Sequence, residues 1–162
     1  MARISTIMNA NPLTVKKEAT ISEAAKLMAD KPHGCVIVTE NKKPLGIITE
    51  SDLVKNMVSG KINPTTKVSR VMSSSVTAIP HNSKLENANK IIDTKGFRRY
   101  PVVDKEGNLV GLVNENDVVQ AINDNIRFHR NLQNTVLILF IAFEFFVFIL
   151  YRYLINYFPF LR

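Results

Sequence analysis

The chain contains one internal repeat. Residues 8–58 return as residues 72–122, displaced by 64 positions at first and by 65 later. Identical residues at matched positions are Met8 and Met72, Ala24 and Ala88, Lys26 and Lys90, Gly46 and Gly111, Glu50 and Glu115, Asp52 and Asp117, and Val54 and Val119. The additional residue is expected between Lys31 and Cys35, where a loop can accommodate it. The duplication predicts two similar units packed about a pseudo-twofold axis with equivalent clefts between them, which suits a small-ligand sensor better than an enzyme.

Within each repeat the apolar pattern predicts a strand, a helix, two strands and a second helix, an α/β (α+β) fold. The first helix opens with the capping pattern Thr20-x-x-Glu23. The expected elements of the first repeat are strands over 13–15, 35–39 and 45–48, a turn over 40–44, and helices over 20–28 and 50–58. Those of the second are strands over 76–79, 101–103 and 109–113, and helices over 85–92 and from 115 onward. We expect the first repeat to span 1–60 and the second 61–126.

The C-terminal part of the chain has a different composition. From Val136 to Leu150 every residue is apolar except Glu144, and thirteen are Leu, Ile, Phe or Val. These residues contribute about −4 to −8 kcal/mol to bilayer insertion, against about +3 kcal/mol for one carboxylate. A helix over 135–155 is about 31 Å long, close to the thickness of the hydrocarbon core. We expect a transmembrane helix over 135–155, after a connector over 127–134 and before a short tail over 156–162. A helix buried in an oligomer is the alternative, but apolar residues occur all round this one.

The order of the segments predicts the orientation of this helix. The first residues are not followed by the apolar region of a secretory signal, and the repeats precede the apolar segment. The expected protein is therefore a single-pass membrane protein with its repeats in the cytoplasm. Two interpretations of Glu144 remain open: a contact between helices in an oligomer, or a carboxylic acid that the bilayer tolerates.

Composition disfavours several functions. The net charge of +7 and the pI near 9.6 fit simple solubility, anionic ligands such as nucleotide phosphates, or an anionic membrane surface. Lys and Arg are scattered along the chain, which disfavours binding to nucleic acid. The single cysteine, Cys35, excludes an internal disulfide and lies in an apolar run that predicts a buried strand. His33, His81 and His129 are far apart and no nucleophile or phosphate-loop motif is present, so no enzyme, catalytic residue, metal site or cofactor is expected.

Two motifs are candidates for binding an anionic ligand. Thr49-x-x-Asp52 has two compatible interpretations. In one, Thr49 caps a helix and Asp52 favours the positive end of its dipole. In the other, the Asp52 carboxylate accepts hydrogen bonds from a ribose diol while the Thr49 hydroxyl and the free helix amides face a phosphate. Arg98-Arg99 precedes a strand, where such a pair is often solvated, but guanidinium groups match phosphate oxygens well.

Four segments of the chain resemble tandem CBS domains, the Bateman module. They are Thr20-Ile-Ser-Glu-Ala-Ala-Lys-Leu-Met28, Gly46-Ile-Ile-Thr-Glu-Ser-Asp52, Gly96-Phe-Arg-Arg-Tyr-Pro-Val-Val-Asp104 and Gly111-Leu-Val-Asn-Glu-Asn-Asp117. Each motif is weak alone, but their order, found twice within about residues 4–125, is specific. The resemblance implies two CBS-type units, a homodimer of modules, and adenine-nucleotide binding in the clefts between units, as in many relatives.

The resemblance also implies which residues form the two clefts. One cleft would combine Thr49 and Asp52 with Arg98, Arg99, Tyr100 and either Lys84 or Asn89. The other would combine Asn114 and Asp117 with Thr20, Ala25 and Gly34-Cys35-Val36. In the second cleft Asn114 replaces the usual Thr or Ser, and Pro32-His33-Gly34 supplies no arginine. We therefore expect the second cleft to bind more weakly or to be empty.

The sequence thus predicts a membrane-anchored regulatory module that binds AMP, ADP or ATP and signals to a membrane or protein partner. Two alternatives remain open. One is a ligand-free structural module whose clefts are closed by side chains. The other is a sensor of S-adenosylmethionine or magnesium, although Glu50, Asp52, Glu115 and Asp117 form only a thin acidic set for a magnesium ion.

Overall fold

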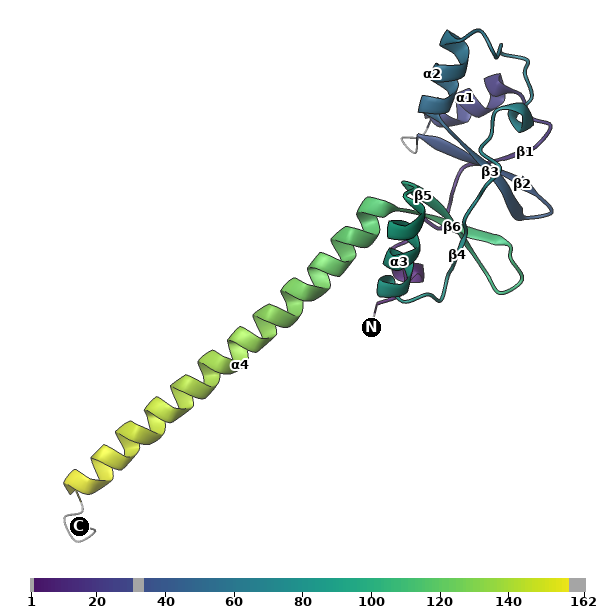
Figure 1. Cartoon of the computed structure of the whole chain (residues 1–162). Helices are drawn as coiled ribbons and strands as arrows, with labels where there is room; N and C mark the ends of the chain where they lie inside the picture. Colours follow the sequence, from purple (N-terminus) through teal and green to yellow (C-terminus); the bar gives the residue numbers. More distant parts are fainter. Residues whose placement is uncertain (1, 31–33, 158–162) are drawn as a thin grey trace. The chain divides into compact units, whose positions relative to one another are not determined.

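The computed structural model describes residues 2–30 and 34–157 of the chain (Figure 1). Contacts divide the chain into two units, residues 1–121 and 122–162, and the first unit holds nearly all of both repeats. Pro32 and His33, which were expected to supply no arginine to the second cleft, lie outside the described residues.

The first repeat follows a short 3₁₀ helix, η1 (Ile4–Thr6). Its elements are β1 (Thr14–Lys16), α1 (Ile21–Asp30), β2 (Cys35–Glu40), β3 (Lys43–Thr49) and α2 (Glu50–Val58). β1 runs parallel to β2, and β2 pairs with β3 in the antiparallel sense. α1 begins at the predicted capping box, in which Glu23 Oε2 accepts from Thr20 N at 2.7 Å and Thr20 Oγ1 accepts from Glu23 N at 3.3 Å.

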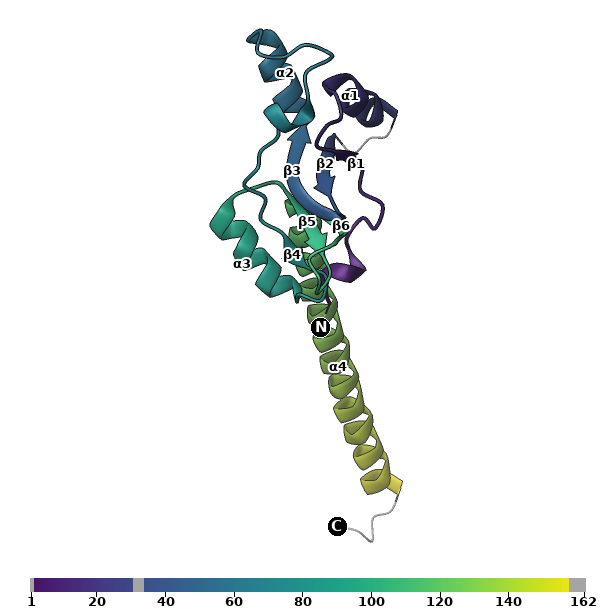
Figure 2. The ribbon, with the colours of Figure 1, turned by 90° about the vertical axis from the view of Figure 1, so that its right-hand side faces the viewer.

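The second repeat has the same order of elements. After η2 (Val68–Arg70) come β4 (Ile79–Pro80), α3 (Leu85–Lys95), β5 (Arg99–Val103), β6 (Leu109–Asn114) and the start of α4 (Glu115–Tyr157). Its sheet has the order β4-β5-β6 with the same pairing directions (Figure 2). The predicted α+β fold with two β-α-β-β-α units is confirmed. β4 is shorter than the strand expected over 76–79, because only Ile79 and Pro80 pair with β5.

The strand registers locate the difference in length between the repeats. Val38 of β2 pairs with Gly46, and Val102 of β5 pairs with Gly111. Val38 and Val102, the matched residues of β2 and β5, are 64 positions apart in the sequence. Their pairing partners, Gly46 and Gly111, are 65 positions apart. The insertion expected between Lys31 and Cys35 is therefore wrong. The extra residue lies in the second hairpin turn, where it changes no strand register.

The two hairpin turns are built differently. In the first repeat the chain reverses at Asn41 and Lys42, whose φ angles are +48° and +66°. Consecutive positive φ values are typical of a tight two-residue hairpin turn. Lys43 and Pro44, expected in the turn, belong to β3; Pro44 lies beside an irregularity of the β2–β3 register, where proline is tolerated. In the second repeat a longer turn contains Gly107 at φ +82°.

In each repeat, the segment before the first strand packs on the other repeat. This exchange is reciprocal, which is the pattern that a pseudo-twofold axis produces. The bridges that carry it form two pairs related by the repeat: Asn9 with Leu112 and Ser73 with Ile47, then Arg3 with Lys84 and Lys67 with Thr20. In Figure 2 the N-terminal segment accordingly lies beside the strands of the second repeat.

Two methionines cross the sheets at glycines. A Cβ atom on Gly111 would lie 2.6 Å from Met8 Sδ, and one on Gly46 would lie 2.5 Å from Met72 Sδ. Any side chain at either position would therefore overlap the crossing segment. Each repeat thus makes the same contact between a methionine and a glycine of the other repeat. This contact explains why the methionines and glycines are identical at matched positions.

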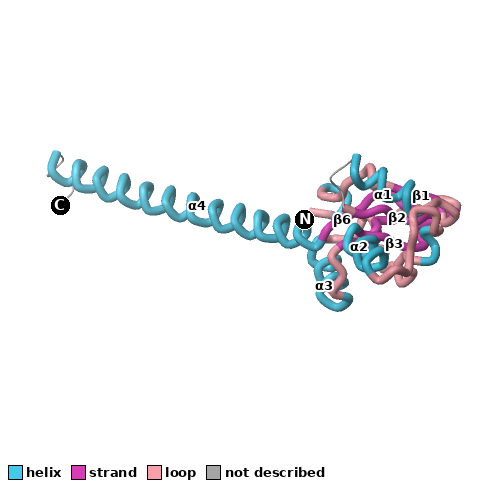
Figure 3. The backbone as a smooth tube through the Cα atoms, turned by 90° about the horizontal axis from the view of Figure 1, so that it is seen from above, coloured by secondary structure: helices cyan, strands magenta, loops and turns pink. Residues whose placement is uncertain are grey.

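The two sheets meet through a small buried cluster. It contains Cys35 and Ile37 of β2 and Leu112 of β6, with Ile47 and Leu109 packed against it. Figure 3 shows the strands gathered together, with helices α1, α2 and α3 around them. Burial of these apolar side chains joins the two repeats into one unit.

α4 is a single continuous helix that runs through both the connector expected over 127–134 and the segment expected over 135–155. Its large apolar side chains between 136 and 155 are 39–66% exposed. The helix is long and apolar enough to cross a membrane, judged by length and composition only, and its most apolar stretch is not buried.

Candidate functional site

Thr49 and Asp52 form a capping box at the start of α2. Asp52 Oδ2 accepts hydrogen bonds from Thr49 N at 2.9 Å and from Thr49 Oγ1 at 2.7 Å, and Thr49 Oγ1 accepts from Asp52 N at 3.2 Å. The capping interpretation is therefore confirmed. Both bonds to the carboxylate use Oδ2, so the lone pairs of Oδ1 remain suited to a ligand hydroxyl. The two interpretations of this motif stay compatible.

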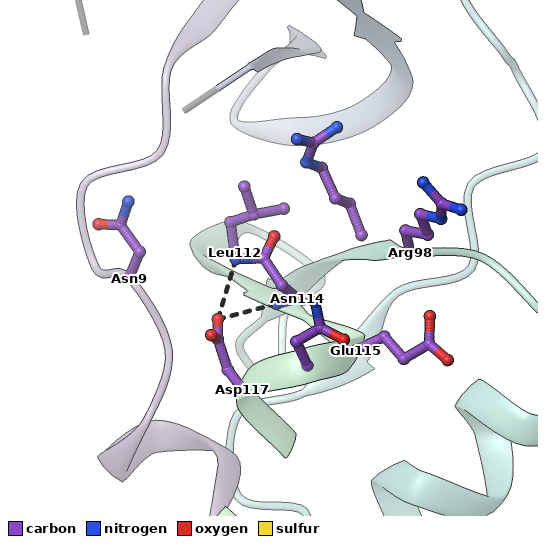
Figure 4. Close-up of a pocket in the computed structure, with 8 residues that line it drawn as sticks. Asn9, Arg98, Leu112, Asn114, Glu115 and Asp117 are labelled. Atoms are coloured by element: carbon purple, nitrogen blue, oxygen red, sulfur yellow. Dashed lines mark hydrogen bonds between the residues drawn. The ribbon is translucent and has the colours of Figure 1, made fainter. Parts of the chain in front are cut away.

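Asn114 and Asp117 occupy the same positions at the start of α4. Asn114 N and Nδ2 donate to Asp117 Oδ2 at 3.3 Å and 2.9 Å (Figure 4). The carboxamide thus holds the aspartate as the Thr49 hydroxyl does. It differs in chemistry, because its Oδ1 is an acceptor only, whereas a hydroxyl both donates and accepts.

A cleft of about 600 Å³ opens beside Thr49 and Asp52. We name it the hydroxyl cleft, because its lining includes Thr49, Ser51, Ser73, Ser75 and Thr77. Its charged lining residues are Glu50, Asp52, Lys55, Arg98 and Arg99. The sequence prediction that Thr49, Asp52 and the arginine pair meet in one place agrees with this geometry.

A second cleft of about 730 Å³ opens beside Asn114 and Asp117. We name it the amide cleft, because Asn9, Asn114 and Asn116 line it. Its charged lining residues are Arg98, Arg99, Glu115 and Asp117. In Figure 4, Asn9 and Arg98 lie on opposite sides of this cleft. Both clefts have volumes typical of small-molecule sites, so neither is filled by side chains.

The two clefts are related by the repeat. In the order amide cleft then hydroxyl cleft, the matched lining residues are Asn9 and Ser73, Leu112 and Ile47, Asn114 and Thr49, Glu115 and Glu50, Asn116 and Ser51, and Asp117 and Asp52. The carboxylates are thus identical in the two clefts. The three polar neutral positions differ systematically, with hydroxyl groups in one cleft and carboxamides in the other.

The arginine pair breaks this symmetry. The backbone N–H of Glu115 donates to Arg98 O at 3.0 Å, and that of Glu50 donates to Gly34 O at 3.2 Å. Gly34 is therefore the structural partner of Arg98, and Cys35, the next residue, is the partner of Arg99. The first repeat has no cation at these two positions. Arg98 and Arg99 line both clefts instead.

The side chain of Arg99 reaches the first repeat. Its Nη2 lies 2.9 Å from where a Cβ on Gly34 would stand, and Glu50 Oε2 lies 3.5 Å from that point. Burial raises the pKa of the Cys35 thiol, and the positive charge of Arg99 lowers it by a smaller amount. Glycine at position 34 thus leaves room for this guanidinium between the two repeats.

Several predicted site residues do not line either cleft. Tyr100 is fully buried, and its hydroxyl accepts from Phe97 N at 2.9 Å and donates to Ile92 O at 3.3 Å. It is the partner of Val36, a core position of β2. Lys84 is exposed before α3, and Asn89 Nδ2 donates to Asp93 Oδ2 at 2.9 Å.

The second predicted cleft is assembled differently from expectation. Thr20 caps α1, and Ala25 lines a separate groove with Ile21 and Met57. Cys35 is only 1% exposed. The structure brings Asn114 and Asp117 together with Arg98 and Arg99 rather than with these three residues, so the cleft expected to have no arginine has two.

Sequence reasoning missed the lining residues that come from the crossing segments, above all Asn9 and Ser73. The repeat does match them to each other, but nothing in the pattern says that each lies against the opposite repeat. Among the described residues, no group of three His, Cys, Asp or Glu side chains is placed to hold a metal ion.

The family of CBS domains matches the chain twice, over residues 4–59 and 68–124, which is most of its length. The chain belongs to the CBS domain family. Its CBS pair is 32% identical to the CBS domain-containing protein YhcV of Bacillus subtilis over 123 residues, covering 76% of this chain and 86% of that protein. It is 38% identical to an uncharacterised protein of Methanopyrus kandleri over 105 residues, covering 64% of this chain and 54% of that protein.

Solved CBS structures share the fold of this CBS pair. A CBS domain pair in complex with 5′-methylthioadenosine and S-adenosyl-L-methionine has a TM-score of 0.67 at 21% identity, covering 76% of this chain and 98% of that one. A CBS domain protein from Pyrobaculum aerophilum complexed with AMP has a TM-score of 0.64 at 23% identity, covering 72% and 89%. The cytosolic domain of the Mg²⁺ channel MgtE in complex with ATP has a TM-score of 0.64 at 22% identity, covering 74% and 48%.

Proposed function

We propose that this CBS pair is a non-catalytic regulatory module that binds an adenine nucleotide in the hydroxyl cleft. The observation that carries the proposal is the meeting, in one open cleft, of the Thr49–Asp52 capping box and the Arg98–Arg99 pair. Asp52 Oδ1 suits a ribose diol, and the guanidinium groups suit phosphate oxygens. The adenine nucleotides bound by the related CBS structures support the same ligand class.

The arginine pair favours a nucleotide over S-adenosylmethionine, which a related CBS pair binds. A phosphate monoester carries a charge of about −1.5 to −2 at neutral pH and gains charge-assisted hydrogen bonds from guanidinium. The sulfonium of S-adenosylmethionine is cationic and would be repelled by Arg98 and Arg99. Nucleotide binding then favours one arrangement of the two repeats, to the extent that the ligand binds one arrangement more tightly than the other.

Isothermal titration calorimetry of the full chain in detergent micelles tests this proposal with AMP as the probe. Asp52→Asn should weaken AMP binding at least about tenfold, because the ribose hydroxyls lose a charged acceptor worth roughly 1.5 kcal/mol or more. The amide oxygen of the new side chain can still accept the capping hydrogen bonds, so the fold should be kept.

Glu23→Gln is the matched control. Glu23 is the carboxylate of the equivalent capping box at α1 and lies outside both clefts, so this change should leave AMP affinity unaltered. A wild-type chain that releases no heat with AMP and shows no thermal stabilisation by it would refute nucleotide binding.

We further propose that residues 135–155 anchor the CBS pair to a membrane, with the repeats in the cytoplasm and a membrane protein as the regulated partner. The exposed apolar surface of α4 between 136 and 155 supports the anchor. A related CBS pair lies in the cytosolic domain of a Mg²⁺ channel, which supports the same kind of partner.

A homodimer of modules is the third part of the proposal. α2 leaves apolar side chains in solvent, with Val54 60%, Met57 57% and Val58 85% exposed. Burying such a patch against a second copy is favourable. Met57→Glu combined with Val58→Glu should convert a dimer into a monomer, measured by light scattering of the detergent-solubilised chain. Lys61→Glu, just beyond α2, is the control, and a monomeric wild type would contradict the dimer.

A further inference from the structure

The two clefts share one pair of cations, Arg98 and Arg99, although each has its own carboxylates. The lining of the hydroxyl cleft combines the arginines and Lys55 with Glu50 and Asp52. The lining of the amide cleft combines the same arginines with Glu115 and Asp117 and includes no lysine. The two clefts together are lined by three cationic side chains and four carboxylates. The clefts are thus symmetric in their negative charge and not in their positive charge.

From this sharing we propose that the two clefts exclude each other for phosphate-bearing ligands, so that one CBS pair holds one nucleotide at a time. The inference rests on the proposed nucleotide binding and adds how the clefts are coupled. A phosphate in one cleft draws both guanidinium groups towards itself. The other cleft is then left with two carboxylates, which repel a second phosphate. Binding at one cleft therefore weakens binding at the other, and by linkage the effect is reciprocal.

The cation Lys55 decides which cleft fills first. Neutral donors line both clefts, as serine and threonine hydroxyls in one and carboxamide N–H groups in the other, but only the hydroxyl cleft adds a third cation, Lys55. The amide cleft replaces the matched hydroxyls by Asn9, Asn114 and Asn116. AMP therefore binds in the hydroxyl cleft first, and the amide cleft is a site of lower affinity that uses the same arginines.

Calorimetry of the full chain in detergent, with AMP as the probe, tests the sharing. The wild-type chain should bind one AMP per chain, with any second AMP at least about tenfold weaker. Asp52→Asn should not abolish binding but move it to the amide cleft at lower affinity. Asp117→Asn should weaken the second binding event.

The decisive comparison adds Arg98→Gln with Arg99→Gln to each aspartate variant. If the arginines serve both clefts, AMP affinity should fall at least about tenfold in the Asp52→Asn chain and also in the Asp117→Asn chain. Adenosine, which has no phosphate, is the control ligand, and its affinity should not respond to the arginine changes. Circular dichroism melts verify that each variant is folded.

Several results would overturn the inference. Two equal and independent AMP sites in the wild type would do so while leaving nucleotide binding intact. An Asp52→Asn chain that binds no AMP would also do so, because the arginines would then serve one cleft only. These two measurements need no change at the arginines, so they decide the matter even if the arginine variants fail to fold. No AMP binding at all would reject the proposed function together with the inference.

Discussion

Gly111→Ala is expected to destabilise the first unit by about 1–3 kcal/mol, although alanine at an ordinary strand position normally stabilises. Without a clash, replacing glycine by alanine restricts the unfolded chain and gains about 0.4–1 kcal/mol. Here the new Cβ would lie 2.6 Å from Met8 Sδ, 3.0 Å from Asn9 O and 3.1 Å from Met8 Cγ. Overpacking of this kind costs about 1–3 kcal/mol. The sign of the effect therefore tests whether the crossing segments are exchanged between the repeats.

Gly46→Ala is the matched variant in the other repeat. The three atoms nearest to its Cβ would all belong to the Met72 side chain, with Sδ at 2.5 Å, Cγ at 2.8 Å and Cβ at 3.0 Å. Met72→Ala should therefore restore most of the stability that Gly46→Ala loses. Met8→Ala should restore a smaller share of the stability that Gly111→Ala loses, because a backbone oxygen also lies close to that Cβ. Urea unfolding of the single and double variants measures this difference.

Gly60 provides the control for these glycines. A Cβ there would meet nothing within 4 Å, but its φ of +68° is one that side chains rarely adopt, so Gly60→Asn, the best tolerated change there, should cost less than about 1 kcal/mol. If Gly46→Ala and Gly111→Ala were both stabilising, the crossing of the methionines over the strands would be wrong.

The sequence was sufficient to predict the elements of the fold because the two repeats constrain one another. Ile21, Ala24 and Met28 recur as Leu85, Ala88 and Ile92, so the buried face of α1 also identifies that of α3. The length difference was misplaced for a physical reason. Hydrophobic class alone cannot distinguish a one-residue shift before β2 from one in the following turn, whereas the pairing of Val38 and Val102 with the glycines can.

The candidate site was only partly predictable. Thr49 and Asp52 could be assigned because capping and ligand binding require the same residue types at the same spacing. The burial of Tyr100 could not be predicted from the sequence. Neighbouring residues of a strand point to opposite faces, and which face is buried at the start of β5 depends on the register with β6. The contributions of Asn9 and Ser73 depend on a crossing of the chain that leaves no periodic signal in the sequence.

Removal of residues 135–162 is expected to move the chain from the membrane fraction to the soluble fraction. The exposed Leu, Ile, Phe and Val residues of 136–150 favour insertion by about −4 to −8 kcal/mol, and Glu144 opposes it by about 3 kcal/mol. The net energy favours the bilayer, so the wild-type chain should resist extraction by alkaline carbonate. The shortened chain should be released and still bind AMP, because both clefts lie within residues 1–121.

A full-length variant separates insertion from mere truncation. Ile141→Arg with Val147→Arg adds about 5–7 kcal/mol of unfavourable insertion energy, which exceeds the net gain of about 1–5 kcal/mol and should release the chain from the membrane. Ser69→Arg with Thr94→Arg places the same two charges on exposed positions of the first unit and should leave the chain in the membrane fraction. If the wild-type chain is already released by carbonate, the apolar face of α4 is covered by protein rather than lipid. The anchor would then have to be replaced by an assembly helix whose partner buries the residues from 136 to 155.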